Sequence, residues 1–129
     1  MISIPVSIGE LADKITILQI KAFRMPPGRQ RENVHRELSD LARVWSADGP
    51  QMTETPRIAM LLIKLRHVNE KIWELENSIR RHMEDELFNK QFIGIACSIH
   101  RLNDKRASIK REINLITNSS LIEEKYHGS

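Results

Sequence analysis

The sequence of 129 residues is poor in residues that stop helices and in residues that cross-link chains. It contains five Gly, five Pro and the single cysteine Cys97, and aromatic residues make up only 5% of it. One cysteine excludes an internal disulfide and a zinc site built from several cysteines. So few Gly and Pro exclude a collagen-like or Gly-rich β-protein. Because 40% of the residues are hydrophobic and 29% are charged, we expect a folded chain with long helices and one domain over residues 1–129.

Long hydrophobic runs are also missing. The longest purely apolar run covers residues 58–63, far short of the roughly 18 residues needed to cross a bilayer. The first basic residue is Lys14, which follows the apolar start of the chain, whereas a signal peptide has the opposite order. The sequence therefore predicts a cytoplasmic protein that has no membrane partner.

Apolar residues recur at helical spacing in four segments, about 8–25, 29–47, 56–83 and 88–117. The pattern Ser7-x-x-Glu10 is a capping box at the start of the first segment. Breaker residues at 26–28 end the first segment, and breakers at 48–50 end the second. We predict an all-α antiparallel bundle that combines a short helical hairpin with two longer helices. No Gly or Pro separates the longer helices, so one kinked rod is the alternative, and a short tail helix is expected after residue 119.

The unequal helix lengths predict self-association. At about 1.5 Å per residue, the third and fourth segments are each roughly 40 Å long and the first two nearer 27 Å. Two short helices cannot cover the apolar seams of two long ones, and uncovered apolar surface favours a partner. We therefore expect a homodimer or a higher assembly; a monomer with bent long helices is the alternative.

Several segments, in similar order along nearly the whole chain, resemble a bacterial family of small helical proteins of unknown function. The matching segments are 9–18 (GELADKITIL), Val68-Asn69 with Trp73, 103–107 (NDKRA), 109–114 (IKREIN) and 123–126 (EEKY). The resemblance implies a small cytoplasmic helical protein. It implies no activity, substrate or catalytic residue.

Arg106 is the most informative single residue, because it occupies an apolar seam position of the fourth segment. A charge there is costly unless it is paired or reaches solvent. One interpretation is a salt-bridged arginine that fixes helix register or oligomeric state. The other is an anion-binding pocket inside the bundle. The candidate ligand-binding or anion-binding residues are Asp13, Lys14, Arg106, Lys110, Glu123 and Glu124.

Four carboxylates form a second candidate site: Glu10 and Asp13, then Glu37 and Asp40. The i, i+3 spacing places each pair on one helix face, and a hairpin would bring the pairs near each other. Such an oxygen cluster suits Mg²⁺, which also binds substrate phosphates. The arrangement is similar to the Glu-x-x-Glu…Glu-x-x-Asp pattern of all-α nucleoside triphosphate pyrophosphohydrolases. Acids at this spacing are also common on solvated helix faces.

Basic residues of the fourth segment suggest a third possibility, because Arg101 and Lys105, and likewise Arg106 and Lys110, are spaced i, i+4. These pairs could bind anions or nucleic acid weakly, but the sequence has no nucleic-acid-binding motif. The sequence therefore favours a non-enzymatic interaction or scaffold module that self-associates and acts without a cofactor, with another protein as a further candidate partner. The alternatives are a Mg²⁺-dependent pyrophosphohydrolase-like enzyme and non-specific anion binding, with nucleic acid not the expected partner.

Overall fold

A computed structural model describes residues 1–50 and 55–117, and this part of the chain is helical without any strand. The predicted all-α bundle with two shorter and two longer helices is confirmed. The predicted tail helix lies outside the described residues. The helices are α1 (Ile8–Arg24), α2 (Arg29–Asp48), α3 (Thr55–Glu84) and α4 (Lys90–Ile116).

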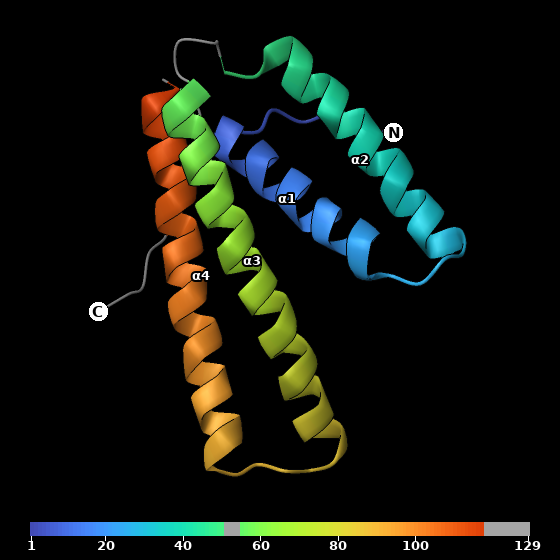
Figure 1. Ribbon diagram of the computed structural model, residues 1–129, viewed down its shortest axis with the longest axis vertical. Helices are drawn as coiled ribbons and strands as arrows, with labels where there is room; N and C mark the ends of the chain where they lie inside the picture. The colour runs from blue at the N-terminus through green and yellow to red at the C-terminus, as the bar shows by residue number, and fades with distance from the viewer. Residues whose placement is uncertain (51–54, 118–129) are drawn as a thin grey trace.

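The two long helices α3 and α4 lie side by side and antiparallel, so they form a hairpin and not a kinked rod (Figure 1). Helix α1 packs against both, at the half of the hairpin that holds the start of α3 and the end of α4. Helix α2 runs back along α1 and diverges from α3 (Figure 1). Helix α1 is therefore the element that joins the two hairpins.

The turn between α3 and α4 reverses the chain without Gly or Pro. Glu86 adopts the left-handed conformation with φ 55°. The amide of Leu87 donates to the carbonyl of His82 at 2.7 Å, and the amide of Glu86 donates to the carbonyl of Met83 at 3.2 Å. This is the bonding of a Schellman motif, which normally has Gly at the left-handed position. Helix α4 then begins at Lys90, two residues later than expected, because Asn89 caps it by accepting from the amide of Phe92.

The hydrophobic core lies where α1 crosses the long hairpin. Leu65 of α3 and Ile113 of α4 are completely buried there, and Ala12 of α1 packs against the same cluster. The remaining buried members are Ile58, Leu61, Val68 and Ile109. These α3 and α4 residues repeat at three- and four-residue intervals, which is the spacing that keeps side chains on one helix face.

The other half of the long hairpin has no third helix over most of its length. We call residues 71–105 the distal hairpin; of its side chains only Ile95 is buried. Phe88 is 62% exposed and Ile93 is 59% exposed. Helix α2 has no buried residue at all. The helices that could cover the long seams thus cover only one end of them, as the length difference predicts.

None of the helices within residues 1–50 and 55–117 is both long enough and apolar enough to span a bilayer.

Candidate functional site

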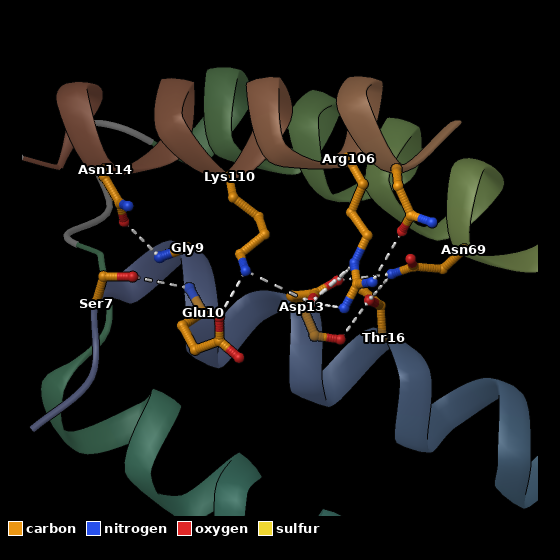
Figure 2. A network of polar contacts seen from close by, with 10 residues as sticks. Ser7, Gly9, Glu10, Asp13, Thr16, Asn69, Arg106, Lys110 and Asn114 are labelled. Atoms are coloured by element: carbon orange, nitrogen blue, oxygen red, sulfur yellow. Dashed lines mark hydrogen bonds and ion pairs between the residues drawn. The ribbon is translucent and has the colours of Figure 1, made fainter. Parts of the chain in front are cut away.

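A buried carboxylate, Asp13, lies between α1 and the long hairpin (Figure 2). Its side chain is 1% exposed, and the guanidinium of Arg106 in α4 donates hydrogen bonds to both of its oxygens. The Nε of Arg106 lies 2.9 Å from Oδ1 and 3.0 Å from Oδ2 of Asp13, and Nη2 donates to Oδ2 as well. Charge-assisted contacts with several bonds per pair are the strongest polar contacts in proteins. This ion pair joins residues 93 positions apart in the sequence.

Helix α3 contributes an amide to the same carboxylate. The Nδ2 of Asn69 donates to Asp13 Oδ1 at 3.0 Å and to Thr16 Oγ1 at 2.9 Å. The Thr16 hydroxyl in turn donates to the backbone carbonyl of Asp13 at 2.8 Å. Asp13, Thr16 and Asn69 are all buried. The carboxylate therefore receives bonds from two helices besides its own, and this fixes how the three helices lie relative to one another.

A second ion pair lies one helical turn away on α1. Lys110 Nζ is 2.5 Å from Oε2 of Glu10 and 3.8 Å from Oδ2 of Asp13. We call Glu10, Asp13, Thr16, Asn69, Arg106 and Lys110 the polar network. It contains two acids and two bases, so its charges balance.

The guanidinium of Arg106 stays charged in this setting. Its hydrogen bonds to Asp13 raise the pKa of Arg106 above its ordinary value, and the negative charges of Asp13 and Glu10 act in the same direction. These effects outweigh burial, which by itself lowers the pKa of a cation.

Close contact between the backbones of α1 and α4 allows these bonds to form. The amide of Gly9 donates to Oδ1 of the buried Asn114 at 2.7 Å (Figure 2). A Cβ atom on Gly9 would lie 2.5 Å from the backbone oxygen of Lys110. Real Cβ atoms do not approach a backbone oxygen so closely, so only glycine fits here. Ser7 caps α1 just before this contact, since its hydroxyl accepts from the amide of Glu10 at 3.0 Å.

Of the six candidate ligand-binding residues, the structure brings three together: Asp13, Arg106 and Lys110. Lys14 is exposed on α1 and takes no part in the polar network. Glu123 and Glu124 lie outside the described residues. The three residues that meet are bonded to one another and to Glu10, so the cluster is arranged as a connection between helices.

The four carboxylates proposed for Mg²⁺ are not gathered into one site. Glu10 and Asp13 face α4 and are paired with its cations. Glu37 and Asp40 are exposed on α2, where Asp40 pairs with Arg43 of the same helix. Within residues 1–50 and 55–117, no group of three or more His, Cys, Asp or Glu side chains is placed to hold a metal ion.

The two basic pairs that the sequence places on α4 differ in exposure. Arg106 and Lys110 are half-buried and engaged with α1. Arg101 and Lys105 are exposed and line a groove between α3 and α4. Of these two pairs, Arg101 and Lys105 are therefore the more accessible to an anion from outside.

Sequence reasoning identified Arg106 from its charge in an apolar seam, and it identified Asp13 as a possible partner. It missed Gly9, Thr16 and Asn114. No spacing rule points to a threonine or asparagine that bonds across helices. A glycine in the first turn of a helix was the available signal, because glycine in a helix often marks a close backbone approach.

Fold and site together define a class: an all-α protein in which a short helical hairpin is joined to a long one by a buried network of ion pairs and hydrogen bonds. The sequence profile of a family of unknown function, DUF6165, matches residues 2–129. The chain therefore belongs to this family. Comparison with curated proteins and with solved structures gives no significant match.

Proposed function

We propose that this chain is a non-enzymatic helical interaction module that associates with copies of itself. The observation that supports the proposal is the apolar surface left uncovered along the long hairpin, including its distal end. At one end the polar network is internally bonded and charge-balanced, so it offers no free group for chemistry. At the other end apolar side chains such as Phe88 and Ile93 are more than half exposed. Apolar surface at the end of a helical seam favours a protein partner.

Molecular mass measured over a range of protein concentrations tests the proposal. Sedimentation equilibrium or light scattering should give twice the 15.0 kDa chain mass, or a higher multiple, at micromolar concentrations. The melting temperature should also rise with protein concentration, because association stabilises the folded state by mass action. A mass of one chain up to several hundred micromolar would overturn the proposal.

The two other functions suggested by the sequence gain no support from these contacts. A pyrophosphohydrolase-like enzyme needs its carboxylates free to hold Mg²⁺, and Glu10 and Asp13 are engaged with Lys110 and Arg106. Weak nucleic-acid binding through the two spaced basic pairs of α4 would lose Arg106 and Lys110, which are engaged with α1. A thermal-shift screen with Mg²⁺ plus a non-hydrolysable nucleotide, and with a DNA duplex at low and high salt, separates them. Stabilisation by metal and nucleotide together would favour the enzyme.

A further inference from the structure

The distal hairpin carries a basic groove between α3 and α4. The groove has a volume of about 470 Å³. Its lining includes three cations, Lys71, Arg101 and Lys105, and two apolar side chains, Leu75 and Leu102. No residue of α1 or α2 lines this groove. We call these five residues the basic groove.

The positive charge of the basic groove is not neutralised within the described part of the chain. Lys71, Arg101 and Lys105 are exposed and form no ion pair there. The one acid that lines the groove, Glu74, pairs instead with Arg24 of α1 at 3.2 Å. Three cations beside apolar side chains suit a partner segment that is acidic and apolar at once.

The end of the same hairpin has that composition. Residues 84–88, which we call the acidic tip, read Glu-Asp-Glu-Leu-Phe, and all five are exposed. Glu84 and Asp85 stand at the C-terminal end of α3, where the helix dipole disfavours negative charge. No cation of the described residues forms an ion pair with Glu84, Asp85 or Glu86. The chain therefore carries two complementary surfaces that do not meet each other within one copy.

Their spacing fits a two-fold symmetric pair of hairpins. Asp85 lies seven residues after Ser78 in α3, and Lys71 lies seven residues before it, about 10 Å along the helix in each direction. In an antiparallel pair with its symmetry axis near Ser78, the acidic tip of each copy reaches the basic groove of the other. Such isologous contacts use the same surface twice.

The surface between the tip and the groove permits close approach. Periodicity places Ser78 of α3 and Gly94 and Ser98 of α4 on the face that carries the groove. Gly94 is exposed, and a Cβ atom added to it would meet nothing within 4 Å. Small side chains on this face leave room for the helices of a second hairpin.

We propose that a second copy of this chain docks its acidic tip in the basic groove, which gives a symmetric dimer in which two distal hairpins form a four-helix bundle. Leu87 and Phe88 of each tip pack on Leu75 and Leu102 of the other copy, and the tip acids face the groove cations. This inference rests on the proposed self-association and specifies the surface that carries it.

Charge reversal on each surface tests the arrangement by sedimentation equilibrium at low salt. The groove variant is Arg101→Glu/Lys105→Glu, and the tip variant is Glu84→Lys/Asp85→Lys. Lysines at these two positions are favourable for folding, because the dipole at the C-terminal end of a helix stabilises positive charge. Each should raise the dimer dissociation constant roughly 10- to 100-fold, since every dimer contains the altered contact twice. The control Arg29→Glu/Arg36→Glu makes the same charge change on exposed α2 residues and should leave the dissociation constant unchanged.

An equimolar mixture of the groove and tip variants gives the decisive result. In the mixed pair both contacts again join opposite charges, so the heterodimer should form at near the wild-type dissociation constant while each variant alone stays weakly associated. If the wild type dimerises but the groove variant matches the control, the proposed surface is wrong and self-association still stands. If the wild type is a monomer throughout, the proposed function fails as well.

Discussion

Replacing Gly9 with alanine tests whether the close approach of α1 and α4 sustains the polar network. The added methyl group would lie 2.5 Å from the backbone oxygen of Lys110 and 2.8 Å from Oδ1 of Asn114. Because a backbone atom cannot rotate away as a side chain can, α1 must move outward. That movement lengthens the 2.7 Å bond between Gly9 and Asn114 and pulls Asp13 from Arg106.

The expected loss follows from three contributions. Overpacking costs about 1–3 kcal/mol, and leaving a buried hydrogen-bonding group unpaired costs about 1–3 kcal/mol more. Alanine recovers up to about 1 kcal/mol through its higher helix propensity. Together they give a net loss centred on about 3 kcal/mol within a range of about 1–6 kcal/mol, and about 3 kcal/mol lowers the melting temperature of a chain of this size by about 12 °C.

Gly94→Ala, in the second turn of α4, is the matched control, because within one copy of the chain the same methyl group meets nothing within 4 Å. It should leave the melting temperature unchanged or raise it. Both variants are best compared by tryptophan fluorescence at low protein concentration, where mass action keeps association small. A Gly9→Ala protein as stable as the wild type would refute the claim that this contact holds the helices in place.

Three further predictions concern the polar network and the α3–α4 turn. Asp13→Ala and Arg106→Met should each lower the free energy of unfolding by about 3–5 kcal/mol, because each leaves a partly or fully buried charge unpaired. In urea unfolding, the double variant should lose clearly less than the sum of the two single losses. Additive losses would show that the pair is not coupled. With Arg106→Lys, the free energy of unfolding should fall at alkaline pH. A lysine whose pKa is raised by a carboxylate stabilises the fold fully below its unfolded pKa of about 10.4, and this contribution is lost as the pH rises through the folded pKa. The wild-type pair, with the pKa of Arg106 raised further above the range of lysine, should keep its contribution there, so equal pH profiles from 9 to 11.5 would contradict this. Glu86→Gly should be more stable than Glu86→Ala by about 1 kcal/mol, because only glycine adopts φ 55° without strain; equal melting temperatures would argue against a strained turn.

Much of the fold could be predicted locally. The capping serine Ser7 and the breakers at 26–28 and 48–50 set helix ends close to those observed. The predicted start of α4, at residue 88, is two residues too early, because the cap Asn89 follows a turn that contains neither Gly nor Pro. A left-handed glutamate at position 86 leaves no sign in the sequence, since its conformation depends on the two bonds that the following turn makes.

The candidate site was predicted only in part. Arg106 was conspicuous because a charge in an apolar seam requires a partner. Which acid would pair with it was not decided, because Asp13 lies 93 residues away and the choice depends on how α1 crosses α4. The same crossing directs Glu10 toward Lys110 and away from Glu37 and Asp40.

Local patterns are enough to predict the helices, because capping residues, breakers and apolar spacing act within a few residues of one another. The same patterns predict the unequal helix lengths and therefore the uncovered seam of the distal hairpin. Which polar groups meet depends on how the helices cross, since a bond such as that between Gly9 and Asn114 requires a close backbone approach that no local pattern encodes. The distal hairpin illustrates the same division. The acids of the tip and the cations of the groove can be read directly from the sequence, whereas the folded hairpin sets the distance between them.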